Sequence, residues 1–197
     1  MKKLLCLWLL STCAFADYYV LGGISTSEGN WKTLGNNFGG GSGTWDHGYR
    51  QPGLSVGVGS LVTLSKEPMP SGLLAEFGYK HIGSAKKTVT GSQDVSIKTH
   101  IPYVAAGVSQ MFKWYRLSCL FGMAHRSLSV SAANPLDITE KSITTPFMSI
   151  RVQKEVLKTN LAVQYALIPG DAKDLNAAVK GFQPTLHELS FLLVHSI

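Results

Sequence analysis

Large apolar residues alternate with small or charged ones along most of this chain, with a period of two residues. In the segment 72–84, Phe77 and Tyr79 share one face, whereas Glu76 and Lys80 share the other. A period of two is typical of β-strands that present two different faces. Clusters of Gly, Pro, Asn, Asp and Ser separate eight such segments, and we expect strands at 17–27, 53–64, 72–84, 95–110, 115–131, 142–154, 159–170 and 181–197.

The expected connections between these strands alternate in length. Four are long, at 28–52, 85–94, 132–141 and 171–180, and the three between them are short. With both termini on one side, every long connection falls on the opposite side, which is typical of outer-membrane barrels. Several segments also reach the about 9–11 residues with which a tilted strand crosses a bilayer. We therefore predict an all-β fold, an eight-stranded antiparallel up-and-down transmembrane β-barrel.

Composition excludes several other classes of protein. The 197 residues are 45% hydrophobic and 15% charged, which argues against a disordered chain, a collagen-like repeat or a charge-rich coiled coil. The 18 basic residues outnumber the 12 acidic ones but are scattered, so no clustered patch indicates a nucleic-acid partner.

The first sixteen residues resemble a secretory signal peptide. Lys2 and Lys3 precede the apolar run 4–10, and the small-x-small site 14–16 predicts cleavage before Asp17. A buried first helix and a lipoprotein cleavage box at 10–13 are the alternatives. We assign 1–16 to the signal peptide and 17–197 to the barrel domain. Removing the signal leaves Cys119 as the one cysteine, so no intramolecular disulfide is expected.

The two strand faces differ in the size of their side chains. One face carries large apolar residues, and the other is mostly Gly, Ala and Ser with a few charges, which suits a narrow barrel interior. Aromatic residues gather near expected strand ends, as at membrane interfaces: Tyr18, Tyr19, Phe112, Trp114 and Tyr115. We expect the apolar face to meet lipid. The alternative is a soluble periplasmic barrel that binds a small apolar ligand in its centre.

Six polar side chains are expected in the lumen: Glu76, Lys80, Arg116, Arg126, Gln164 and Glu188. Unpaired charges are costly in so narrow a space, so we predict that Glu76 and Glu188 accept hydrogen bonds from Arg116 or Lys80. Such a network forms either a structural plug or a gated pore, and the narrow interior favours the plug.

Two strand segments fit the barrel pattern less well. Pro102 and Pro146 each remove a ladder donor from an expected strand, which suggests a bulge or the barrel rim. Arg151 has the same parity as Phe147, and with Phe147 facing lipid it must lie near an interface, or a bulge must change the phase.

Taken together, these features resemble the small outer-membrane β-barrel superfamily that includes the OmpA barrel and opacity-type surface antigens. The resemblance rests on the cleavage site followed by the 17–23 segment Asp-Tyr-Tyr-Val-Leu-Gly-Gly, the eight strands and a last strand that ends the chain. It implies a surface protein, porin-like in architecture, that is inserted by the barrel-insertion machinery. Members usually end in an aromatic residue, whereas this chain ends in Ile197.

An enzymatic alternative rests on three residues. His125 and Ser127, with Glu140 beyond, resemble the nucleophile, base and carboxylate of outer-membrane lipid A deacylases. The family carries this motif close to its C-terminus, whereas here it lies in mid-chain. The more ordinary interpretation is that His125 and Ser127 mark the upper edge of the hydrocarbon band. Histidine spacing indicates no metal site, and no cofactor is expected.

The long first connection is rich in aromatic residues and glycine. Exposed aromatic and arginine side chains on an external loop suit recognition of a host surface or lipopolysaccharide, and a loop folded over the barrel mouth is the alternative. The candidates are Trp31, Phe38, Trp45, His47, Tyr49 and Arg50. We expect a non-enzymatic, monomeric protein of a Gram-negative outer membrane, with an envelope-structural, adhesion or surface-contact role and with membrane lipid and lipopolysaccharide as neighbours.

Overall fold

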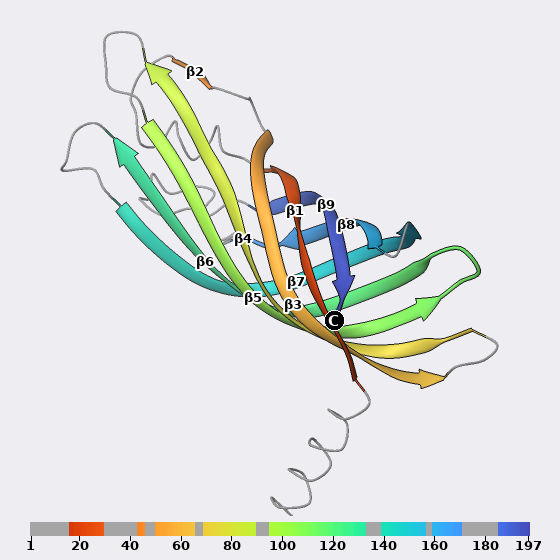
Figure 1. The fold of residues 1–197 in the computed structure, drawn as a ribbon. Helices are drawn as coiled ribbons and strands as arrows, with labels where there is room; N and C mark the ends of the chain where they lie inside the picture. Colours follow the sequence, from red (N-terminus) through yellow and green to blue (C-terminus); the bar gives the residue numbers. More distant parts are fainter. Residues whose placement is uncertain are drawn as a thin grey trace, which may run out of the picture.

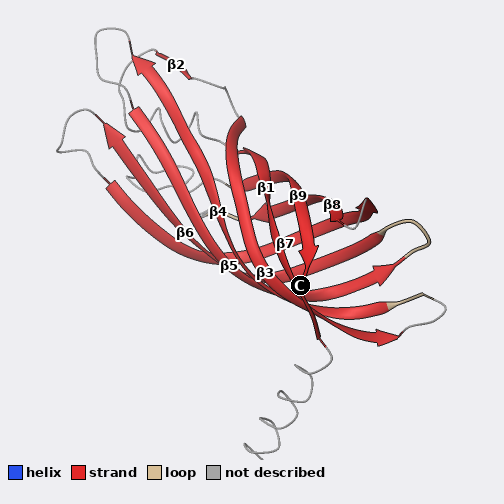
Figure 2. Cartoon of the chain, viewed as in Figure 1, coloured by secondary structure: helices blue, strands red, loops and turns tan. Residues whose placement is uncertain are grey.

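The fold is a closed antiparallel β-barrel (Figure 1). The structure is a computed structural model, and it describes residues 16–29, 43–45, 50–65, 69–89, 95–132, 139–156, 159–170 and 185–197. Every described element is a strand (Figure 2). Within these ranges, no helix is long and apolar enough to cross a membrane.

Eight long strands form the barrel wall, and each overlaps one of the eight predicted segments. They are β1 (Ala16–Glu28), β3 (Arg50–Ser65), β4 (Ser71–Val89), β5 (Val95–Met111), β6 (Arg116–Ala132), β7 (Thr139–Val156), β8 (Thr159–Ile168) and β9 (Leu186–Ser196). Each strand pairs with the next along the chain, and β1 pairs with β9, which closes the barrel. Closure leaves no wall strand with an unpaired edge. A short strand, β2 (Gly43–Trp45), pairs with the end of β4.

The predicted alternation of connection lengths is wrong at its third member. Residues 85–89, expected in a loop, continue β4, so the connection to β5 spans only 90–94. A register shift between Ile82 and Ala85 lets β4 go on pairing with β5. The backbone groups of 85–87 are thereby paired in the ladder instead of being left to a loop. At this end the β4–β5 and β6–β7 hairpins extend beyond their neighbours (Figure 1).

Many large apolar side chains of the wall lie on the outside, as predicted. Phe77, Phe121 and Phe191 are 59%, 60% and 53% exposed and point away from the barrel. The inward face carries small and charged residues such as Ser190 and Glu188, both fully buried, but also large apolar ones such as Leu120 and Leu192, which the sequence pattern did not lead us to expect. A narrow eight-stranded interior has limited room for large rings, and these three phenylalanines occupy the outer face.

The proline and arginine expectations for β5 and β7 need correction. The ladder between β5 and β6 has a gap at Pro102, but its register is unchanged on both sides of the gap. Pro146 lies within an uninterrupted β6–β7 pairing. Phe147 and Arg151 both face inward without a bulge, because the inward face of β7 has room for one large ring that stacks on Tyr103.

Candidate functional site in the barrel interior

The carboxylate of Glu76 is the centre of a buried hydrogen-bond network. It accepts two hydrogen bonds from Arg151 Nη2, at 2.6 and 2.8 Å. The hydroxyls of Tyr19 and Tyr103 donate to its two oxygens, at 2.8 and 2.7 Å. Arg151 Nε also donates to Gln164 Oε1 at 2.8 Å. With four hydrogen bonds from three donor groups on one carboxylate, the burial of the two charges is well compensated.

Two glycines make room for the tyrosines of this network. A Cβ on Gly59 would lie 2.4 Å from the Tyr19 ring, and a Cβ on Gly78 would lie 2.4 Å from the Tyr103 ring. Each ring therefore covers a glycine on a neighbouring strand and extends its hydroxyl toward Glu76. Because Tyr19 is only 7% exposed, its predicted place in an outer aromatic belt is wrong.

A second ion pair is formed by Lys80 and Glu188. Lys80 Nζ lies 2.6 Å from Glu188 Oε1, and both side chains are buried. Ser190 and Ser55 donate to the same carboxylate oxygen, at 2.6 and 3.3 Å. Lys80 also lies 5.5 Å from the centre of the Tyr103 ring, so that ring contacts both ion pairs.

Toward the β4–β5 connection, the interior is filled by arginine and apolar side chains. Arg126 is fully buried, and its Nη1 donates to the Pro169 carbonyl at 3.4 Å. Thr145 donates to the same oxygen at 2.8 Å. Beyond this level lie apolar side chains that are at most 1% exposed: Ile82, Ile97, Leu128, Ile168 and Leu186.

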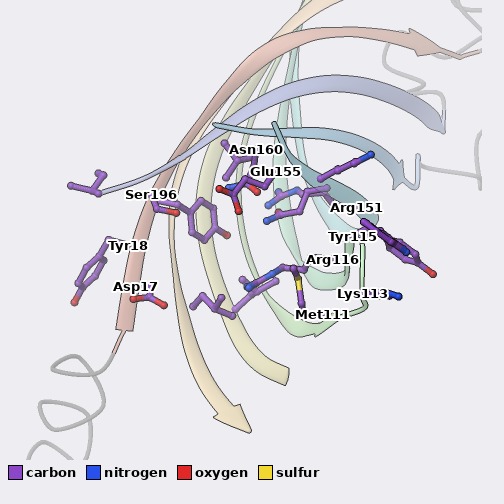
Figure 3. Close-up of a pocket in the computed structure, with 18 residues that line it drawn as sticks. Asp17, Tyr18, Met111, Lys113, Tyr115, Arg116, Arg151, Glu155, Asn160 and Ser196 are labelled. Atoms are coloured by element: carbon purple, nitrogen blue, oxygen red, sulfur yellow. The ribbon is translucent and has the colours of Figure 1, made fainter. Parts of the chain in front are cut away.

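A cavity of about 600 Å³ opens at the opposite end of the barrel (Figure 3). It lies beside the 112–115 turn, the start of β1 and the end of β9. Its lining includes Arg116, Asp17 and Lys113, and Arg151 lies at its inner side. Stacked Phe112 and Tyr115 rings, 5.0 Å apart, brace the turn at its rim. The cavity thus leads inward to the Glu76 network.

The structure brings most of the predicted lumen residues together, but with different partners. Glu188 pairs with Lys80, one of the donors expected for it. Glu76 pairs with Arg151 instead of Arg116 or Lys80, because Arg116 lies at the start of β6, in the cavity near the barrel end. Arg151, Tyr19 and Tyr103 were not among the predicted lumen residues. The signal that could have placed Arg151 inside was its position on the same strand face as Phe147, which a lipid-facing strand face did not explain.

The two strand residues of the enzymatic alternative point outward. His125 Nδ1 lies 3.1 Å from Thr144 Oγ1, so this ring nitrogen faces β7. Ser127 lies opposite His100 on β5 and Ser142 on β7. The described contacts include no hydrogen bond between His125 and Ser127. The backbone of Glu140 pairs with Ser129, and its side chain lies outside the described residues.

Most of the predicted recognition residues lie outside the described part of the chain: Trp31, Phe38, His47 and Tyr49. Trp45 is placed only by its backbone, in β2. Arg50 begins β3, and its Nε lies 3.8 Å from Glu28 in an exposed ion pair at the loop end of the barrel. Ile197 is 82% exposed, and its amide donates to the Tyr18 carbonyl at 2.9 Å.

Solved structures of low sequence identity share this fold. The attachment invasion locus protein Ail of Yersinia pestis, in complex with the heparin analogue sucrose octasulfate, has a TM-score of 0.55 at 11% identity, with 92% of this chain and 97% of Ail covered. A second Ail structure has a TM-score of 0.53 at 12% identity, with the same coverage. Neisserial surface protein A has a TM-score of 0.50 at 12% identity, with coverages of 92% and 99%. No protein-family model and no curated protein sequence matches the chain.

Proposed function

We propose that this protein is a non-enzymatic β-barrel of a Gram-negative outer membrane that acts in envelope structure or surface contact. The observation that carries the proposal is the distribution of side chains across the wall. Large apolar groups such as Phe77 and Val104 are more than half exposed, whereas Glu76, Lys80 and Glu188 are buried inside. In water this arrangement would expose much apolar area and bury charges; in a bilayer the same outer face is solvated by lipid.

The filled interior favours a structural role over transport of solutes. Tyr103 is within contact distance of both ion pairs, and Phe147 stacks on it at 4.6 Å. Apolar side chains such as Ile97 and Leu128 fill the level beyond. A plug of paired charges and packed rings resists the passage of ions and polar solutes. We therefore assign the binding specificity of the protein to its outer surface and its connections.

The proteins of similar fold support surface contact as the role of those connections. One is described as an attachment invasion locus protein and another as a surface protein. The enzymatic alternative receives less support, since the contact of His125 is with Thr144 and not with the candidate nucleophile Ser127.

Membrane placement is tested by extraction and by the mobility of the folded barrel. We expect the expressed protein to stay in the outer-membrane fraction in alkaline carbonate and to migrate differently on gels with and without heating. Cys119, on the outward face of β6, provides an independent probe. In intact membranes it should react with a membrane-permeant maleimide and not with a sulfonated one. A protein released by carbonate, with Cys119 open to both reagents, would overturn the proposal.

A further inference from the structure

A cluster of nitrogen and hydroxyl groups lies on the outer wall where β4 and β5 pair. The register sets His81 opposite His100, and their Nδ1 atoms are 3.3 Å apart, with ring centres 4.7 Å apart. The Tyr79 hydroxyl contacts His100 Nδ1. All three side chains are on the same outward face as Phe77, so they sit on the surface that the proposed function assigns to lipid.

Lys98 adds a permanent positive charge to this cluster. It is exposed and lies two residues from His100 on the same face of β5. The residues opposite on the neighbouring strands are uncharged: Leu54 faces His81, Ser127 faces His100 and Ser129 faces Lys98. Among the described side chains of β3 to β6, no aspartate or glutamate faces outward beside the cluster.

Two further titratable groups stand near the cluster on β6 and β7. His125 occupies the outward face of β6 two residues from Ser127, and its Nδ1 contacts Thr144. The backbone of Glu140 stands opposite Ser129, two strands from Lys98, and its side chain is outside the described ones. Among the described side chains, the charged or titratable groups that adjoin one another here are Lys98, His81 and His100, and no carboxylate lies among them.

The cluster marks the end of the apolar run on its strands. On β4 the outward residues before it include Phe77, and on β5 those after it include Val104, at 59% and 58% exposure. A histidine also borders the outward apolar residues of β9, where His187 Nδ1 lies 2.6 Å from the Tyr165 hydroxyl. These histidines lie toward the long-connection end of the barrel, which is expected at the cell surface.

We propose that His81, His100 and Lys98 bind a phosphate group of lipopolysaccharide in the outer leaflet, with its acyl chains on the apolar wall below. The inference rests on the proposed membrane placement and names the contact that this site makes. A phosphorylated glycolipid matches both parts of this surface. Its apolar chains fit the apolar wall, and its anionic phosphate lies at the depth of the basic cluster. Lysine and protonated histidine donate charge-assisted hydrogen bonds to phosphate oxygens, and the Tyr79 hydroxyl is a further donor. A protonated imidazole donates from both ring nitrogens, and a phosphate group close by favours that protonated form, so binding should strengthen in acid.

Binding of purified full-length protein, refolded in detergent micelles, to bisphosphorylated lipid A tests this proposal. Titrations at pH 5.5 and pH 7.5 are compared with dephosphorylated lipid A and with the phospholipid phosphatidylglycerol. We expect bisphosphorylated lipid A to bind about tenfold more tightly at pH 5.5 than at pH 7.5, which corresponds to about one charge-assisted contact that depends on protonation. The double variant His81→Asn/His100→Asn should lose this pH dependence, and Lys98→Gln should weaken binding at both pH values.

The control is His195→Asn, an exposed outward histidine at the opposite end of the wall, which should bind like the wild type. Heat-dependent gel mobility verifies that each variant is folded. Equal binding of dephosphorylated lipid A, a loss of the same size in His195→Asn, or tighter binding of phosphatidylglycerol would overturn the proposal. If the protein resists carbonate extraction and yet binds without phosphate dependence, this inference fails alone. Release by carbonate would overturn the proposed function as well.

Discussion

Arg151 of β7 and Glu76 of β4 form an ion pair across the lumen, 2.6 Å apart and 75 residues apart in the chain. Their strands are not neighbours in the wall, so the pair is a contact through the interior. Both side chains are at most 2% exposed, and Tyr19 and Tyr103 complete the shell of the carboxylate. This pair links opposite parts of the barrel and blocks the inner end of the cavity.

Removing one partner of this pair should destabilise the barrel strongly. Glu76→Leu leaves Arg151 buried without its carboxylate, and we expect a loss of about 3–5 kcal/mol in the free energy of unfolding. The double variant Glu76→Leu/Arg151→Met removes both charges and should recover most of that loss. Urea unfolding in lipid vesicles, followed by tryptophan fluorescence, measures both. Additive losses in the double variant would show that the two residues are not coupled.

An exposed pair provides the matched control for that experiment. Arg50 and Glu28 lie 3.8 Å apart, with side chains that are 77% and 59% exposed. Because solvent screens such a pair, Glu28→Gln should change the free energy of unfolding by less than about 1 kcal/mol.

Two glycine substitutions should differ sharply in their effect. A Cβ on Gly78 would lie 2.4 Å from the Tyr103 ring, whereas a Cβ on Gly22 meets nothing within 4 Å. Gly78→Ala should displace Tyr103 from Glu76 and cost about 1–3 kcal/mol through overpacking. Gly22→Ala should be neutral or stabilise slightly, since alanine restricts the unfolded chain. Unfolding midpoints of the two variants check this, and a Gly78→Ala barrel as stable as Gly22→Ala would contradict it.

Charge on the outer wall should be tolerated only near its ends. Phe77→Arg places a guanidinium in the middle of the apolar run and should cost about 2–4 kcal/mol, whereas Trp114→Arg, in the short 112–115 turn, should cost about 0–1 kcal/mol. The yield of folded, heat-shiftable protein in vesicles and its unfolding free energy measure both. Equal tolerance at the two positions would indicate that water, not lipid, covers the wall.

The closed interior should conduct ions poorly. In planar bilayers we expect no stable channel from the wild type, because Lys80, Glu188 and Arg151 fill the cross-section together with Tyr103. The double variant Lys80→Ala/Glu188→Ala removes one ion pair but leaves the apolar level beyond it filled, so it should also give no stable channel. Large, steady conductance from the wild type would contradict a plugged interior and favour the gated pore.

Alternation predicted the strands and their faces because it depends only on residue order. The outward positions of Phe77 and Phe121 follow from a period of two once the narrow face is assigned to the interior. Alternation did not predict the inward position of Arg151, because Phe147 lies on the same strand face and was expected to face lipid like other large rings. Stacking on Tyr103 offers Phe147 an inward place, and nothing in the order of residues announces that contact.

The linear chain by itself determined how many wall strands form, which way most of their side chains point and that charges are kept in a confined interior. These properties are local, since each follows from neighbours along one strand. Only the closed barrel decided that Arg151 meets Glu76 and that His81 meets His100. Both contacts depend on register and on which strands face each other after closure, and these are properties of the whole wall.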